Sequence, residues 1–145
     1  MTSNPSLLRH TLATLAYRLG KVVRDAPEAF ADYPQGEQQC AARILAHIGD
    51  LMDWAVSLVD GAVRWHDSTP LPWRDEVARV FETIAEFDRR LASVGAGAAS
   101  EERLFQGPIA DALTHTGQLA MMRRLAGCKM KGENYYIADI RVPSC

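Results

Sequence analysis

Apolar side chains recur at three- and four-residue steps along most of the chain, the spacing that places them on one face of a helix. The first stripe comprises five residues near the N-terminus: Leu8, Leu12, Leu15, Leu19 and Val22. We expect Asn4 or Ser6 to cap its start. Asp25-Ala26-Pro27 should stop it, because a helix rarely continues into a proline. Residues 26–36 then form a long connection.

Two further stripes predict the middle helices. One runs from about Glu37 to Gly61, and its apolar face is Ile44, Ile48, Leu51, Ala55 and Leu58. After a loop over residues 62–71, the next helix starts near Pro72, a residue suited to the first helical position. Its apolar face is Trp73, Val77, Val80, Ile84, Phe87 and Leu91. The small residues at 95–100 then form a flexible link.

The last helical region contains a glycine and a proline. Ser100-Glu101-Glu102 is typical of a helix start, and Gly107-Pro108 must then break, kink or restart the helix. The main fourth helix is expected from Pro108 to about Ala126, followed by a tail in which residues 135–140 are extended. Four amphipathic helices with few strand signals predict an all-α four-helix bundle, with residues 1–145 as one domain.

The composition narrows the function classes. The chain has 145 residues and a net charge of −2, so we expect no nucleic-acid or membrane binding. No apolar run approaches the roughly 20 residues of a membrane span, and the N-terminus does not resemble a signal peptide. The cysteines, Cys40, Cys128 and Cys145, lack metal-type or disulfide-type spacing, which favours a soluble protein of the reducing cytoplasm. There is no Gly-x-Ser-x-Gly motif and no glycine-rich phosphate loop.

One set of polar residues points to a chemistry. Asp111 and His115 are four residues apart on the predicted last helix, so both side chains project from one face. His47 borders the apolar face of the second helix, and the two helices can present all three residues to the bundle axis. An ionised Asp111 facing an apolar interior would be costly unless a cation neutralised it. Two imidazoles and one carboxylate suit Zn²⁺, Ni²⁺, Fe²⁺ or Mn²⁺, and three protein ligands leave a coordination position open.

Each of these residues also has a plainer interpretation. A histidine on a helix is more often a hydrogen-bonded structural residue, and Asp111 in a first helical turn is favourable through the helix dipole alone. Gln118 is either a partner that orients the His115 ring or an ordinary polar residue. Gly117 is expected to permit close helix contact, and Asp50 is interpreted as a solvated residue rather than a base near the metal. The three tryptophans, Trp54, Trp65 and Trp73, either line a pocket or fill the core, and the core is the expectation.

The segment Gly107–Leu119 resembles the fourth-helix signature of the DinB-like (DinB/YfiT) superfamily of metalloenzymes. Members carry a His-x-x-x-His pair followed closely by Gly-Gln. His115 matches the second histidine, Asp111 stands where the first belongs, and His47 matches the remaining ligand. The resemblance covers nearly the whole chain. It implies a four-helix bundle of variant up-and-down topology, often a homodimer, and an activity as a thiol S-transferase or a hydrolase. Asp111 in place of histidine leaves the metal preference open.

Two functions therefore stand side by side. In the first, the protein is a metal-dependent enzyme in which a divalent metal at His47, Asp111 and His115 activates a low-molecular-weight thiol or water toward a small-molecule substrate. In the second, it is a non-catalytic bundle that binds a small ligand or a partner, and the polar trio is structural. Metal content is the observation that first separates them.

Overall fold

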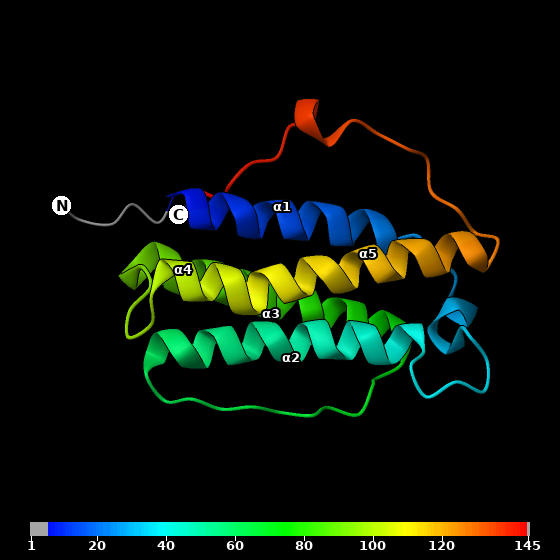
Figure 1. Cartoon of the computed structure of the whole chain (residues 1–145), viewed down its shortest axis with the longest axis horizontal. Helices are drawn as coiled ribbons and strands as arrows, with labels where there is room; N and C mark the ends of the chain where they lie inside the picture. Colours follow the sequence, from blue (N-terminus) through cyan, green and yellow to red (C-terminus); the bar gives the residue numbers. More distant parts are fainter. Residues whose placement is uncertain (1–5, 145) are drawn as a thin grey trace.

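The computed structural model describes residues 6–144 and is helical throughout its regular parts. The helices form four long segments, which lie side by side (Figure 1). Their bounds are α1 Ser6–Val23, α2 Ala41–Asp60, α3 Trp73–Val94, and a last segment built from α4 Glu101–Leu104, the π-helical turn η2 Phe105–Ile109 and α5 Ala110–Leu125. Two short 3₁₀ turns are η1 Glu28–Asp32 and η3 Tyr135–Ile137. Residues 6–144 form no strand, which confirms the all-α class.

The helices run in two parallel pairs. Trp73, at the start of α3, packs edge-on against Phe30 of η1, with ring centroids 5.6 Å apart, at the end where α2 also begins. At the other end, the Ala98 amide beyond α3 donates to the Val59 carbonyl of α2 at 3.0 Å. The α2 and α3 helices are therefore parallel, and residues 61–72 cross the length of the bundle to join them (Figure 1). The α1 and α5 helices run in the opposite direction.

The predicted apolar faces form the core. Every residue of the first stripe is buried, and the faces of α2 and α3 are buried except for Leu58 and Val77, which are half-buried. Burial of apolar area at about 25 cal/mol per Å² is the main term that holds such helices together. The periodicity of the sequence therefore identified the inward faces correctly.

The start of α2 differs from expectation. It begins at Ala41 rather than near Glu37. The preceding residues form a turn in which the Glu37 amide donates to the Pro34 carbonyl at 3.2 Å, and the Ala41 amide donates to Tyr33 at 2.9 Å. These bonds occupy the backbone groups that an earlier helical turn would need. At its other end α2 stops at Gly61, whose φ of 75° is left-handed and favours glycine.

The last helical segment passes through its proline without breaking. Ser100 caps the start, accepting the Arg103 amide at 3.2 Å as its sequence predicts. Pro108 has no N–H to donate, and the chain widens into the π turn η2 around it before α5 begins at Ala110. A helix starting at Pro108 was thus two residues early. Gly127, with a φ of 85°, follows the end of α5.

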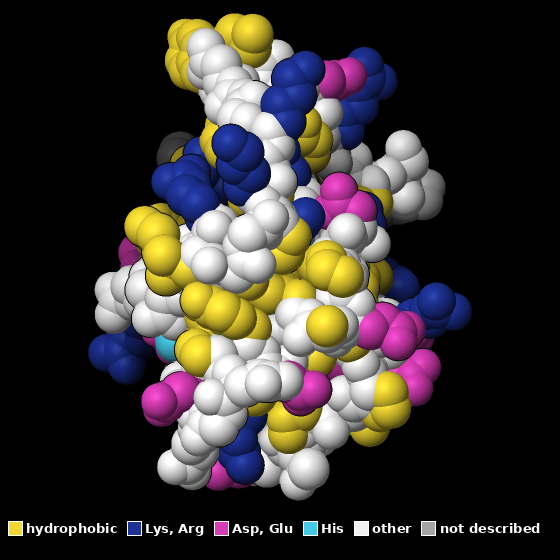
Figure 2. All heavy atoms as spheres, turned by 90° about the vertical axis from the view of Figure 1, so that its right-hand side faces the viewer, with side chains coloured by type: hydrophobic (Ala, Val, Ile, Leu, Met, Phe, Trp, Pro, Cys, Tyr) yellow, Lys and Arg dark blue, Asp and Glu magenta, His cyan; other side chains and the backbone are white. Residues whose placement is uncertain are grey.

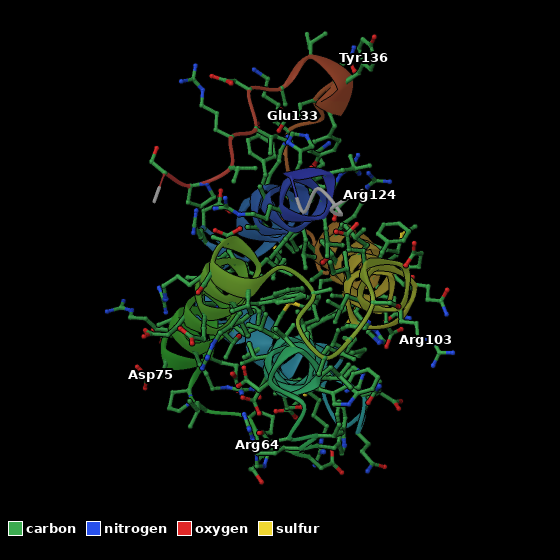
Figure 3. All side chains as sticks on the ribbon, turned by 90° about the vertical axis from the view of Figure 1, so that its left-hand side faces the viewer. Arg64, Asp75, Arg103, Arg124, Glu133 and Tyr136 are labelled. Atoms are coloured by element: carbon green, nitrogen blue, oxygen red, sulfur yellow. The ribbon has the colours of Figure 1, made fainter. Side chains whose placement is uncertain are left out.

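The tail lies along α1 (Figures 1 and 3). Glu133 accepts hydrogen bonds from the Tyr17 hydroxyl at 2.8 Å and from Lys21 Nζ at 2.7 Å. The Arg18 guanidinium lies 4.0 Å from the centre of the Tyr135 ring. Residues 135–137 form η3 rather than the extended strand expected there. The predicted cap Asn4 and the third cysteine Cys145 lie outside the described residues. No helix in the described part of the chain is long and apolar enough to cross a membrane.

Candidate metal centre

The α2 and α5 helices bring His47, Asp111 and His115 together. One ligand atom from each lies within 4.8 Å of the other two. His115 Nε2 is 3.5 Å from Asp111 Oδ1, and His47 Nε2 is 3.7 Å from Asp111 Oδ2. The carboxylate therefore stands between two imidazoles that meet edge to face, with ring centroids 4.8 Å apart. The grouping predicted from helical spacing forms in the structure.

The site lies at the rim of the bundle rather than in its core. The Asp111 side chain is 48% exposed, His47 is 37% exposed and His115 is 17% exposed. The expectation that Asp111 faces an apolar interior was wrong, because its neighbour Ala112 takes the inward position of that turn. Burial therefore does not force a cation onto this carboxylate, and the case for a metal depends on the convergence of three donors.

Gln118 orients the His115 ring. Its Oε1 lies 2.7 Å from His115 Nδ1, one helical turn away. An amide oxygen only accepts, so Nδ1 carries the proton and Nε2 keeps its lone pair toward Asp111. The second interpretation of Gln118, as an ordinary polar residue, is replaced by this contact.

Trp65 of the 61–72 crossover forms one wall of the site. Its ring meets the His47 ring at a centroid distance of 5.7 Å and the Trp54 ring at 5.9 Å. Trp65 is 48% exposed and Trp54 is half-buried, so the expectation of three core tryptophans is correct only for Trp73. No sequence periodicity marks a loop residue, which is why the contact of Trp65 with His47 was missed.

Two other expectations near the site are wrong. Asp50 is not solvated: it is 2% exposed and accepts the Ser68 amide at 2.9 Å and the Ser68 hydroxyl at 2.7 Å. Its hydrogen bonds hold the crossover, and its ion pair is with Arg79 rather than with the triad. Gly117 does not permit close helix packing, because a Cβ there would meet no atom within 4 Å.

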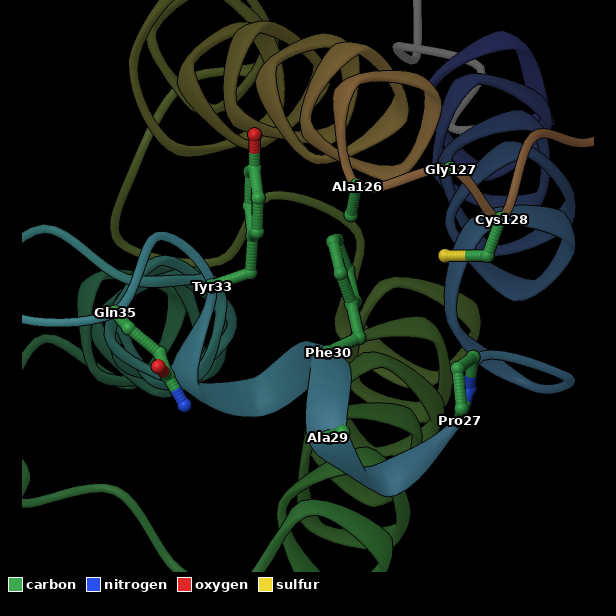
Figure 4. Close-up of a pocket in the computed structure, with 8 residues that line it drawn as sticks. All are labelled: Pro27, Ala29, Phe30, Tyr33, Gln35, Ala126, Gly127 and Cys128. Carbon is green, nitrogen blue, oxygen red and sulfur yellow. The ribbon is translucent and has the colours of Figure 1, made fainter.

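One hollow lies beside the candidate centre, and another lies at the end of the bundle. One, of about 370 Å³, includes Asp111, Thr114 and Trp54 in its lining and opens to solvent. The other, of about 470 Å³, lies where hydrophobic side chains gather at the end of the bundle (Figure 2). Phe30, Tyr33 and Cys128 point into this second hollow (Figure 4). It holds no metal-ligating group of three, so the first hollow is the one with chemistry beside it.

The donor types suit a transition metal, and binding one would require the three side chains to move closer together. Tetrahedral Zn²⁺ with bonds of about 2.0–2.1 Å places neighbouring ligand atoms about 3.3 Å apart. The two carboxylate–imidazole distances, 3.5 Å to Oδ1 and 3.7 Å to Oδ2, are close to that value but involve different oxygens of Asp111. One ligand atom from each residue lies within 4.8 Å of the other two, so the side chains must move together by up to about 1.5 Å to bind one ion. Asp111 and His47 are partly exposed and have room to rotate.

Comparisons with protein-family models, curated proteins and solved structures gave no match.

Proposed function

We propose that this protein is a metal-dependent enzyme of the DinB-like superfamily, with His47, Asp111 and His115 as the ligands of one divalent transition metal. The observation that carries the proposal is the convergence of these three donors from two helices within 4.8 Å. The hydrogen bond between Gln118 and His115 supports it, because metal-binding histidines usually donate their second ring nitrogen to such a partner. The all-helical bundle agrees with the fold that the resemblance implies.

The surrounding residues give the site its chemical character. Asp111 is exposed beside a hollow, so a small molecule can approach the triad from that side. The Trp65 ring of the crossover contacts the His47 ring edge to face. A divalent transition metal in this position would lower the pKa of a coordinated thiol or water and so provide a nucleophile near neutral pH. The thiol case gives an S-transferase and the water case a hydrolase.

Metal content tests the proposal. The purified protein, reconstituted separately with Zn²⁺, Ni²⁺ and Mn²⁺ and then desalted, should retain about one metal ion per chain by elemental analysis. His115→Ala should lose it, because two donors rarely hold such an ion. His10→Ala is the matched control, since His10 is exposed on α1 and outside the triad. A wild-type protein that stays metal-free would refute the proposal.

If metal binds, activity separates the two reactions. Thiols are offered with model electrophiles in one screen, and esters and amides in another. Turnover that needs both a thiol and the intact triad identifies a transferase; turnover without thiol identifies a hydrolase. The homodimer implied by the resemblance is tested at the same time by the sedimentation of the purified chain.

A second candidate function is a non-catalytic bundle that binds a small ligand or a partner. The observation that favours it is the exposure of Asp111, which can form ion pairs with protonated His47 and His115 without any metal. A protein that binds no metal and turns over no substrate would support this alternative.

A further inference from the structure

A second hollow continues the one beside Asp111. The hollow at the triad and a larger one of about 860 Å³ share three lining residues, Trp54, Gln106 and Gly107. We refer to the two together as the α2–α4 trough. It extends from Asp111 of α5 toward residues 98–100, ahead of α4. A site of this length is suited to a molecule larger than the water or thiol at the triad.

The walls of the trough are mainly apolar. The half-buried Trp54 lines both of its parts. Apolar side chains make up most of the rest: Leu51, Leu58, Val63, Ala98, Ala99, Leu104 and Ala110. Gly107 contributes no side chain, and a Cβ there would meet no atom within 4 Å. Apolar walls with a few polar groups are typical of small-molecule sites.

Each of the two hollows that form the trough has one charged residue in its lining. Asp111 and Arg103 are the charged residues among those that line it. Arg103 forms no ion pair with any residue in the described part of the chain, and its side chain reaches the outer edge of the molecule (Figure 3). The guanidinium is thus available to an anion.

We propose that the trough binds a small amphipathic carboxylate, with its apolar body against Trp54 and its carboxylate on Arg103. Arginine suits this role because its planar guanidinium donates two parallel hydrogen bonds to a carboxylate. Residues 103 and 111 lie on one helical segment, and a rise of about 1.5 Å per residue puts them about 12 Å apart along its axis. The proposal rests on the proposed function in one respect, that the end at Asp111 is where the ligand would react.

Binding to chelator-treated, metal-free protein tests this inference without the metal centre. Phenylbutyrate and phenylbutanol serve as probes, because they share an apolar body and differ in the carboxylate. Calorimetry should show phenylbutyrate binding about tenfold more tightly than the alcohol, the effect of one charge-assisted pair. Since no metal is present, a carboxylate preference must come from protein cations.

Three variants locate the site. Arg103→Gln should remove the preference for the carboxylate and leave alcohol binding unchanged. Gly107→Leu should weaken both probes at least about tenfold, because its side chain would occupy the trough; Gly107 has no positive φ, so the backbone accepts leucine. Arg124→Gln, an exposed arginine that lines a different hollow, is the matched control and should bind as the wild type does.

The outcomes separate clearly. A preference that survives Arg103→Gln, that disappears in Arg124→Gln, or that is absent from the wild type would overturn the inference. Unchanged binding in Gly107→Leu would do so as well, provided that thermal melting shows that variant to be folded. None of these results depends on metal binding. The proposal for the trough can therefore be refuted without refuting the metal centre, and the metal centre can be refuted without refuting the trough.

Discussion

Gln118 determines which nitrogen of His115 faces Asp111. Its Oε1 accepts from Nδ1 at 2.7 Å, so the lone pair of Nε2 remains free to bind a metal. Gln118→Leu should therefore weaken metal affinity by about 10- to 100-fold, the usual effect of losing such a partner. Folding should change little because Gln118 is exposed. Competition with a chromophoric chelator measures the affinity.

The same substitution at an exposed glutamine elsewhere is the control. Gln38 lies in the connection before α2 and contacts no residue of the triad, so Gln38→Leu should keep wild-type affinity. Equal affinities for the two variants would show that Gln118 does not orient the ring.

For individual residues, the sequence correctly predicted which side chains of one helix lie close together. Steps of three and four residues correctly placed Asp111, His115 and Gln118 within reach of one another. Spacing along one helix does not reveal how much of a side chain the neighbouring helices cover. For that reason the exposure of Asp111 and the open space beside Gly117 were not foreseen.

Among the elements, the 61–72 crossover depends on a buried polar cluster. Asp50 accepts two hydrogen bonds from Ser68, and Arg79 Nη1 lies 3.4 Å from its Oδ1. Arg79 also bonds to Glu76 at 2.6 Å, and Glu76 accepts the Leu71 amide at 3.1 Å. An irregular segment has few backbone partners of its own, so these carboxylates fix its path and, with it, the position of the Trp65 ring.

Loss of Asp50 should destabilise the fold. Asp50→Ala leaves the Ser68 amide unpaired and removes one partner of Arg79, which should cost about 2–4 kcal/mol in the free energy of unfolding. Urea denaturation measures this difference. Asp53→Ala is the matched control on the same helix: Asp53 is partly exposed, its ion pairs with Arg64 and His66 are at 3.8 and 3.5 Å, and its loss should cost under about 1 kcal/mol. Similar losses for both variants would contradict the role given to Asp50.

The elements show where sequence reasoning stops. Apolar periodicity located the long helices, and turn residues located most of their ends. The partners of Asp50 lie 18 and 29 positions away, and no local pattern connects them. The sequence likewise allowed a break, a kink or a restart of the helix at Pro108. The structure has a π turn there, in which Pro108 and Ile109 are buried.

Across the whole molecule, the chain ends by returning along α1. Arg123 of α5 donates to the Val22 carbonyl at 2.7 Å and to the Cys128 carbonyl at 2.9 Å, so it joins α1, α5 and the start of the tail. Further along, the tail contacts α1 through Glu133 and Tyr135. Because the Glu133 contacts with Tyr17 and Lys21 are polar and exposed, a change of pH should release the tail before it affects the buried apolar core.

The direction of that pH dependence follows from Glu133. Hydrogen bonds from Lys21 and then Tyr17 hold the pKa of Glu133 below its ordinary value of 4.5. A carboxyl whose pKa is lowered on folding stabilises the folded form above its unfolded pKa, and this is lost as the pH falls through the folded value. The bond to Glu133 likewise raises the pKa of Lys21 above 10.5, so its contribution is lost as the pH rises through that higher value. The tail should therefore stay docked between these limits.

Nuclear magnetic resonance of the Tyr135 ring protons tests this prediction. In the wild type, the signals should shift as the pH falls, with a midpoint below 4.5, the ordinary value for Glu133. Glu133→Gln should show the low-pH signals at neutral pH, because it lacks the charge that Lys21 binds. Glu82→Gln, at an exposed position of α3, should titrate as the wild type does. Circular dichroism at each pH separates release of the tail from loss of the helices. If Glu133→Gln titrates as the wild type does, then Glu133 does not hold the tail on α1.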